Sequence, residues 1–299
     1  MYRSRVSSFY HAQLLTGGNP IGFSALAARL SDDTPNSAEV VSSTDGCELM
    51  AQVQHSPGER SARLVFITPD PKTDNPALPP LLEYLCVCAG EMGAVNLLAE
   101  MRESDQTIEA FRRSGFCIYG WETIWRLPAQ AAELERGKAT GWRQASPKDE
   151  TRVRSLSHTL VPPLVQTAEP YQANSTSRLV YQQNDEILAF VESLIGPKGI
   201  FLTPVIHPSL NDPGAMLNEL HSLFSGADKP IFVQMRSYQA WLTTFLEQME
   251  ASVTVHFALM SHRVAVAQYA AVEQNGLVVN NRHAETTAPI VQKTSQIGQ

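Results

Sequence analysis

The sequence lacks the features that mark membrane, secreted and metal-binding proteins. It has only four cysteines in 299 residues, and Cys86 and Cys88 stand too close together for the usual zinc-binding pair, with no second pair elsewhere. No apolar run approaches the ~18 residues of a membrane span, and no apolar signal-peptide core follows the N-terminal arginines. We therefore expect reduced cysteines in the core, no metal site and a cytoplasmic protein.

Positive charge is also scarce. The chain carries 30 acidic and 23 basic side chains, a net charge of −7, and has no run of Lys and Arg that would attract nucleic acid or an anionic membrane. Hydrophobic residues make up 43% and charged residues 18%, a balance typical of globular proteins. Because the chain exceeds the ~100–200 residues of one domain, we expect two domains of about equal size.

The first half of the chain predicts alternating strands and helices. Apolar and β-branched runs predict strands, and apolar residues at helical spacing predict helices. The expected strands are 47–54, 62–67, 94–101 and 116–127, and the expected helices are 79–92 and 105–114. Gly115 followed by Phe116 is typical of a helix that ends in a left-handed residue and a hydrophobic contact.

The second half repeats this order of elements. The expected strands are 187–193, 200–205, 230–237 and 252–266, and the expected helices are 215–224 and 238–250. A shift of 136 residues places Leu64 on Ile200 and Val95 on Ile231. Few residues are identical at matched positions, so the repeat lies in the order of elements, and chance agreement stays open.

A fresh unit begins near residue 140. Trp142–Glu150 reads as a short strand followed by a helix that starts at Ser-Pro, and the polar stretch 128–140 before it reads as a linker. We therefore expect domains over 1–139 and 140–270 and a polar tail over 271–299. We also expect the last strand of one half to pack beside the other half, because bare sheet edges are costly.

Two stretches resemble the GNAT (GCN5-related N-acetyltransferase) superfamily. Leu97–Met101 with Ala110–Phe116 is similar to the family's strand, short helix and Gly-Phe, and Trp142–Glu150 is similar to its opening strand and helix. The resemblance covers about 40–127 and 141–266. It implies an α/β (α+β) fold of two tandem GNAT-like domains, each a mixed, mostly antiparallel sheet flanked by helices. Each sheet would splay between its central parallel strands to admit the pantetheine arm of an acyl-CoA.

The family's pyrophosphate loop is eroded in the first half. This loop has the form [Q/R]-x-x-G-x-[G/A] and offers backbone N–H groups at a helix N-terminus. The matching stretch, 69–80, has no glycine, and Pro79 and Pro80 have no N–H to donate. Asp70 and Asp74 add negative charge where an anion would bind.

The second half matches the loop only in part, because Gly214 is the one glycine in 207–216. The resemblance implies acetyl-CoA as co-substrate, held by Val205, Asn211, Gly214 and Ala215. A second interpretation needs no ligand, since Asp212 as N-cap with Pro213 at the first helical position is a common helix start.

The family's catalytic tyrosine is missing. Its place four residues before the Gly-Phe holds Phe111, which has no proton to give. Tyr238 and His207 are the remaining catalytic candidates, although a tyrosine there also serves as an ordinary amphipathic anchor and a His-Pro as an ordinary turn. Glu100 and Glu122 lie in apolar strands, where burial would raise a carboxyl pKa unless the groups face water.

The resemblance implies an acyl-CoA-dependent N-acyltransferase that moves an acetyl group from acetyl-CoA to a small-molecule amine. The C-terminal half is the better candidate for binding the acyl-CoA. A non-catalytic GNAT-fold module that binds a ligand or a protein is the alternative, and an unrelated α/β protein is a third interpretation. We expect no nucleic-acid or membrane partner, and a homodimer stays open.

Overall fold

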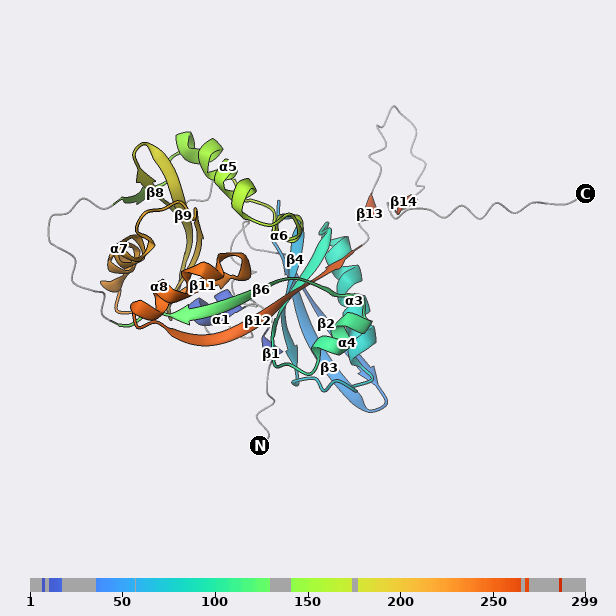
Figure 1. Ribbon diagram of the computed structural model, residues 1–299. Coiled ribbons are helices and arrows are strands. Elements are labelled where there is room, and N and C mark those ends of the chain that lie inside the picture. Colours follow the sequence, from blue (N-terminus) through green and yellow to red (C-terminus); the bar gives the residue numbers. More distant parts are fainter. Residues whose placement is uncertain are drawn as a thin grey trace, which may run out of the picture.

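The computed structural model describes residues 7–8, 11–17, 36–56, 58–129, 141–173, 177–264, 267–268 and 285–286. They form the mixed α/β fold that the sequence predicts, a large sheet with helices on both faces (Figure 1). The strands are β1 Ser7–Ser8, β2 Asn36–Thr44, β3 Cys47–His55, β4 Ser61–Thr68, β5 Asn96–Arg102, β6 Cys117–Arg126, β7 Trp142–Gln144, β8 Arg178–Gln183, β9 Glu186–Ile195, β10 Ile200–Ile206, β11 Ile231–Arg236, β12 Ser252–Arg263, β13 Ala267–Gln268 and β14 Glu285–Thr286.

Most of the predicted tail and the linker from 130 to 140 lie outside the described residues. The helices are α1 His11–Gly17, α3 Leu78–Glu91, α4 Ile108–Arg113, the 3-10 turn η1 Pro147–Asp149, α5 Glu150–Leu160, α6 Pro163–Ala168, α7 Pro213–Ser225, the 3-10 segment η2 Ser237–Leu242 and α8 Thr243–Gln248.

One sheet of 12 strands runs through both halves of the described chain. Its order is β2-β3-β4-β5-β12-β6-β11-β10-β9-β8-β7, with β1 added on β4. The division into domains 1–139 and 140–270 stays a prediction, because this single sheet joins the two ranges. We refer below to residues before 130 as the N-terminal half and to those after 140 as the C-terminal half.

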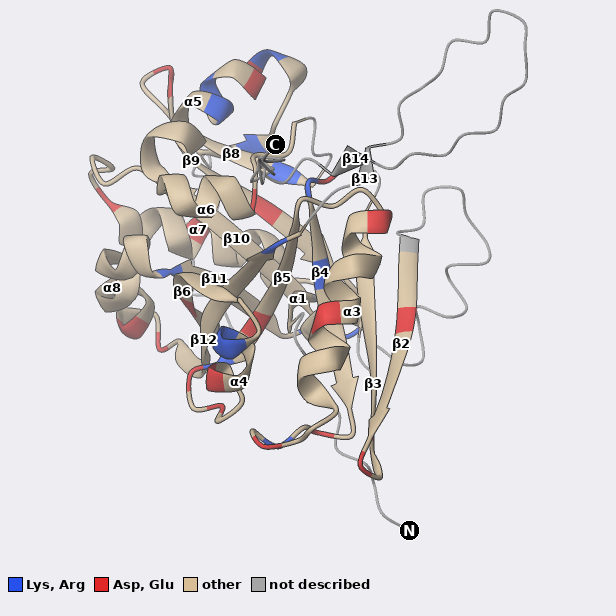
Figure 2. Ribbon diagram, turned by 90° about the vertical axis from the view of Figure 1, so that its right-hand side faces the viewer, with Lys and Arg blue, Asp and Glu red and all other residues tan. Residues whose placement is uncertain are grey.

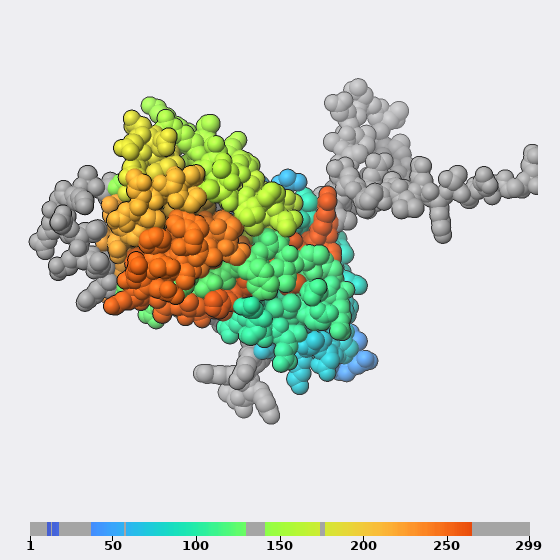
Figure 3. All heavy atoms as spheres, viewed as in Figure 1, coloured from blue at the N-terminus to red at the C-terminus, as the bar shows by residue number. Residues whose placement is uncertain are grey.

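The two halves exchange their last strands. β12 of the C-terminal half lies between β5 and β6 and is antiparallel to both, while β6 of the N-terminal half lies between β12 and β11. Figure 3 shows the green atoms of the N-terminal half against the orange atoms of the C-terminal half along this seam. The expectation that the last strand of one half packs beside the other half is therefore confirmed for both halves.

The order of elements repeats, but at two offsets rather than the single offset of 136. β3 and β4 start 139 residues before β9 and β10, whereas α3, β5, α4 and β6 start 135 residues before α7, β11, α8 and β12. The change falls in the connection between the fourth strand and the helix, which spans residues 69–77 in the first half and 207–212 in the second. This connection is the stretch that corresponds to the pyrophosphate loop.

Both halves end their short second helix in the same way. Gly115 has φ +90° and the Phe116 amide donates to the Phe111 carbonyl at 3.1 Å, as the sequence predicts. In the second half Glu250 takes the left-handed conformation, with φ +58°, and the Ala251 amide donates to Leu246 at 3.0 Å. A glutamate in this conformation carries a steric cost that glycine avoids, which is why the sequence gives no stop signal there.

Each face of the sheet carries its own helices. α3 and α4 cover the buried apolar residues of β3, β4 and β5, and α7 and α8 cover those of β10 and β11 on the same face. Figure 2 shows α3 lying across this face beside β2 and β3. The opposite face carries α1, α5 and α6, so charged residues of the central strands are enclosed there rather than exposed to water.

The described residues test the expectation that the cysteines lie in the core. Cys47, Cys86 and Cys88 are partly buried, but Cys117 is exposed, because it stands at the outer start of β6. No group of three or more His, Cys, Asp and Glu side chains in the described ranges is placed to hold a metal. None of the described helices has the length and apolar character needed to cross a bilayer.

The strand exchange predicts that the halves stay together without a covalent link. We expect a chain cut at a protease site inserted between residues 133 and 137 to elute as one species. Backbone hydrogen bonds on both edges of β12 hold the C-terminal fragment to the N-terminal fragment. Size-exclusion chromatography of the cut chain in native buffer and in denaturant measures this. Separation of the two fragments in native buffer would contradict the exchange.

Candidate functional site

Each half contains a pair of central parallel strands that separate along their length. β4 and β5 pair only from Ser61–Arg63 to Asn96–Leu98, and β10 and β11 pair only from Ile200–Leu202 to Ile231–Val233. Beyond these residues the strands diverge and leave a wedge. We call the gap between β4 and β5 the N-terminal wedge and the gap between β10 and β11 the C-terminal wedge.

The N-terminal wedge is filled by the chain itself. β1 pairs antiparallel with β4 at Ser7 with Ile67 and Ser8 with Phe66, beyond the point where β5 leaves β4. β3 holds the other edge of β4, so β1 occupies the edge that faces the wedge. The backbone groups of β4 in this wedge are therefore already used by a peptide strand.

No described strand pairs with β10 inside the C-terminal wedge. The Ile200 amide donates to Pro230 at 3.0 Å, so alternation along the strand turns Pro204 toward the same side. Pro204 has no N–H, and its carbonyl accepts a hydrogen bond of 3.2 Å from Nε2 of Gln239. Gln239 is buried, and its Oε1 has no partner among the described residues.

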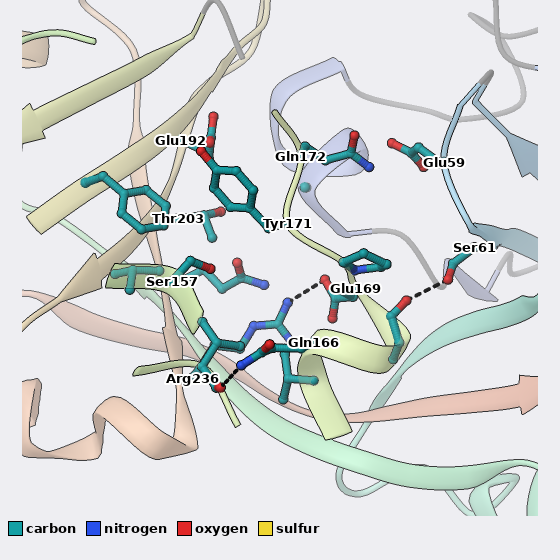
Figure 4. A pocket seen from close by; sticks show the side chains of 18 of the residues that line it. Glu59, Ser61, Ser157, Gln166, Glu169, Tyr171, Gln172, Glu192, Thr203 and Arg236 are labelled. Carbon is teal, nitrogen blue, oxygen red and sulfur yellow. Dashed lines mark hydrogen bonds and ion pairs between the residues drawn. The ribbon is translucent and has the colours of Figure 1, made fainter. Parts of the chain in front are cut away.

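A cavity of about 470 Å³ lies at the C-terminal wedge, on the face that carries α5 and α6 (Figure 4). Thr203 and Val205 of β10 and Gln234 and Arg236 of β11 line it, and Tyr238 of η2 stands beside them. The N-terminal half contributes lining residues from β4 and β5, and the segment that ends α6 forms another wall. The cavity is thus built by both halves.

Arginines and carboxylates that join the halves form one wall of this cavity. Arg236 Nη2 donates to Glu169 Oε2 at 2.9 Å, and Arg236 Nε lies 3.4 Å from Glu122 Oε2. Arg63 of β4 lies 3.6 Å from Glu169 and 3.8 Å from Glu100. Figure 4 shows Arg236 and Glu169 pointing toward each other across the cavity. Two arginines therefore form ion pairs with three carboxyl groups.

The three carboxyl groups do not share this positive charge equally. Burial raises the pKa of Glu122 to about 8, against the opposing effect of Arg236 and with added repulsion from Glu100 and Glu169. For Glu169 burial also acts to raise the pKa, but Arg236 and Arg63 outweigh it and hold the pKa below its usual value. Glu122 is buried rather than facing water, and this burial favours its protonated form.

The tyrosines beside the network keep their protons. Burial raises the pKa of Tyr238 to about 12, although Arg236 opposes the rise. Burial also raises the pKa of Tyr119, whose hydroxyl donates to Glu169 Oε1. Tyr238, which lines the cavity, therefore keeps its hydroxyl proton at neutral pH.

The helix that follows each wedge has few free backbone donors. At α7 the Ala215 amide donates to Asp212 Oδ1 at 2.8 Å, and Pro213 has no N–H. At the start of α3 the Leu78 amide donates to the Asn75 carbonyl at 3.1 Å, and two prolines follow. Both N-termini are satisfied mainly by their own chain, and the one at α7 carries a negative charge as well.

The sequence-predicted site residues fall into two groups. Val205 and Tyr238 line the cavity, whereas Asn211, Gly214 and Ala215 lie at the start of α7 on the other face and are not among its lining residues. A Cβ at Gly214 would lie 3.4 Å from the Phe245 ring, an ordinary contact, so packing leaves room for alanine at this position.

His207 also lies away from the cavity wall. Its Nδ1 is 2.6 Å from Ser209 Oγ and accepts from the Ser209 amide at 3.1 Å, so the imidazole is held within its own turn. Sequence reasoning missed Arg236, Glu169 and Gln239. A charged residue at the end of the apolar strand Ile231–Arg236 is the signal that points to the first of them.

Comparisons with known proteins place the fold. No protein-family model and no curated protein sequence matches the chain. A GCN5-related N-acetyltransferase from Sphaerobacter thermophilus is similar in structure, with a TM-score of 0.51 and 13% identity over 86% of this chain and 95% of that chain.

Two further solved structures are more distant. A GCN5-related N-acetyltransferase from Kribbella flavida has a TM-score of 0.49 and 11% identity over 80% of this chain and 95% of that chain. A tandem GNAT protein from the clavulanic acid biosynthesis pathway has a TM-score of 0.47 and 11% identity over 79% and 85%.

The raised pKa of Glu122 predicts a pH-dependent stability. The unfolded carboxyl loses its proton near pH 4.5, while the folded one keeps it to about pH 8. The contribution of Glu122 to the free energy of unfolding is thus complete below pH 4.5. It falls as the pH rises toward 8 and stays low above pH 8.

We expect Glu122→Gln to raise the melting temperature at pH 9 and to change it little at pH 5. Each pKa unit corresponds to about 1.4 kcal/mol, so thermal unfolding followed by circular dichroism resolves the difference. Glu247→Gln, at an exposed position of α8, serves as the control. An equal effect of Glu122→Gln at both pH values would argue against a protonated Glu122.

Proposed function

We propose that this chain, which has the fold of the GCN5-related N-acetyltransferases, is an acyl-CoA-dependent N-acyltransferase that acts at the C-terminal wedge. One observation supports the proposal: the cavity described above lies at the C-terminal wedge. Beyond Leu202, the β11-facing edge of β10 carries no described strand, and Thr203, Arg236 and Tyr238 line the cavity there. The pantetheine arm would enter along β10, and a small amine would occupy the cavity.

The groups inside the C-terminal wedge suit an extended chain that contains amides. Gln239 holds the Pro204 carbonyl with its Nε2 and has an unpartnered Oε1 that can accept an amide N–H. A buried carbonyl without a donor is costly, so a ligand that supplies one N–H is favoured there. Val205, which the sequence predicts as a cofactor-binding residue, follows Pro204 on β10 and lines the cavity.

The start of α7 suits a pyrophosphate less well. Asp212 takes the Ala215 amide and adds a negative charge, and Pro213 has no donor, so the Gly214 amide is the main group left for a phosphate. We therefore propose that Asn211, Gly214 and Ala215 contact the pyrophosphate weakly, and that the arm in the wedge carries most of the affinity for acetyl-CoA.

Tyr238 is the residue that we propose as general acid. When an amine nitrogen bonds to the thioester carbonyl carbon and the carbon–sulfur bond breaks, the leaving thiolate needs a proton. Burial raises the pKa of Tyr238 to about 12, so its hydroxyl keeps its proton at neutral pH, and Tyr238 is one of the residues that line the cavity. His207 was the second catalytic candidate from the sequence, and its distance from the cavity wall favours Tyr238 over it.

A second function has its own support. In the N-terminal half, the two prolines at the start of α3 have no N–H to donate to a pyrophosphate. In the C-terminal half, Asp212 accepts the Ala215 amide and adds negative charge at the start of α7. This favours a non-catalytic module that binds another ligand or a protein. A thiol-release assay with acetyl-CoA and a broad amine panel separates the two, since sustained turnover excludes the non-catalytic function. A cytoplasmic location and a homodimer stay predictions.

Gly214→Pro tests the acyl-CoA site. The substitution removes the remaining first-turn amide of α7, and we expect it to weaken acetyl-CoA binding about tenfold in calorimetric titration, the worth of one hydrogen bond to a charged group. Gly214→Ala keeps the amide and adds only a Cβ, so it controls for packing against Phe245. If the proline variant binds acetyl-CoA as tightly as the wild type, the pyrophosphate does not bind at the start of α7.

Tyr238→Phe tests the general acid. We expect kcat to fall by about 10² with little change in KM, because general acid catalysis typically contributes that much and the ring itself remains. His207→Ala is the comparison, and we expect it to leave kcat nearly unchanged. Loss of turnover in the histidine variant with normal turnover in Tyr238→Phe would reverse the assignment.

A further inference from the structure

The N-terminal wedge makes specific contacts with a polypeptide. Beside the pairing of Ser7–Ser8 with β4, Glu100 of β5 accepts the backbone amide of His11 at 2.8 Å through its Oε2. The same oxygen lies 3.2 Å from His11 Nδ1. The His11 ring packs on Phe257 of β12 with 3.8 Å between ring centroids. Both strands of the wedge and the exchanged strand therefore contact this N-terminal segment.

The same wedge offers little to a ligand with phosphates. The Ala77 amide donates to Asn75 Oδ1 at 2.9 Å and the Leu78 amide to the Asn75 carbonyl, and Pro79 and Pro80 have no N–H. The buried Glu100 carboxylate also disfavours an anion. The groups that remain are the backbone edge of β4 and the Glu100 carboxyl group, and both bind a peptide backbone here.

The segment continues from the wedge onto the other half. The Lys198 amide donates to the Thr16 carbonyl at 2.9 Å at the turn between β9 and β10. A Cβ on Gly196 would lie 2.3 Å from the Thr16 oxygen, and one on Gly199 would lie 2.8 Å from the Leu15 oxygen. The glycines of this turn therefore permit the close approach of α1, whose Ala12 lines the cavity.

We propose that the N-terminal wedge is a binding site for an extended polypeptide strand, and that its ligand is the chain's own strand Ser7–Ser8 together with His11. The edge of β4 binds the backbone of Ser7–Ser8, and Glu100 binds the backbone amide and the ring of His11. The bound strand anchors α1 across the seam, where α1 forms part of the cavity wall. This assignment rests on contacts in the N-terminal half and is independent of the activity proposed for the C-terminal wedge.

A peptide added in trans tests the site. We expect a synthetic peptide of residues 1–17 to bind a chain that lacks residues 1–17 with one-to-one stoichiometry, and to bind the full-length chain at least tenfold more weakly because its wedge is filled. A Ser7→Pro, Ser8→Pro peptide has no N–H at either paired position and should bind about tenfold more weakly than the parent peptide. A Ser7→Thr, Ser8→Thr peptide keeps both amides and should bind like the parent.

The proposal is overturned if the proline peptide binds as tightly as the parent peptide, or if the full-length chain binds as tightly as the truncated chain. It is also overturned if the truncated chain keeps its circular dichroism and thermal transition but binds no peptide. Should the truncated chain fail to fold, the same pair of substitutions is made in the full-length chain. Neighbouring amides of a strand point to opposite edges, so one of the Phe66 and Ile67 amides faces β1. Hydrogen exchange at that amide should then speed up at least tenfold in the proline variant only, and unchanged rates at both positions reject the site.

Discussion

The pairing of β12 with β6 is the constraint on which the rest of the structure depends. Each of these strands lies in the interior of the sheet and has backbone groups that need partners on both sides. β12 takes one set of partners from β5 and the other from β6, and β6 takes its second set from β11. Neither half completes its sheet alone, so residues of the two halves that are far apart in sequence are brought onto one face.

The charge network follows from this exchange. Pairing in register places Arg236 of β11 opposite Glu122 of β6, and β5 brings Glu100 onto the same face. A buried arginine without partners would be strongly destabilising, and the carboxylates that pair with it come from the other half and from the end of α6. Burial raises the pKa of Glu122 although Arg236 opposes the rise, so this carboxyl group is the one that favours its protonated form. The polar cavity between the halves is a result of the same geometry.

Local signals in the sequence predicted the order of elements well. The left-handed end at Gly115 and the helix start at Asp212 depend on neighbours in the chain, and both are present. What the sequence did not reveal depends on partners far away along the chain. β1 has only two residues and no pattern of its own, and its pairing with Phe66 and Ile67 exists because β5 diverges from β4. The partners of Arg236 come from β6 and from the end of α6, which no spacing rule connects.

The difference between the two wedges has a physical reason in one residue. An unpaired strand edge leaves backbone N–H groups without acceptors, which is costly where water is excluded. At the offset of 139 that relates β4 to β10, Pro204 matches Val65. Pro204 has no N–H, and Gln239 satisfies its carbonyl, so the edge of β10 can stay without a partner strand. On β4 the matching stretch pairs with β1 at Phe66 and Ile67, and β4 shifts its register with β3 near Val65. The same fold thus closes one wedge with its own chain and leaves the other without a described partner strand.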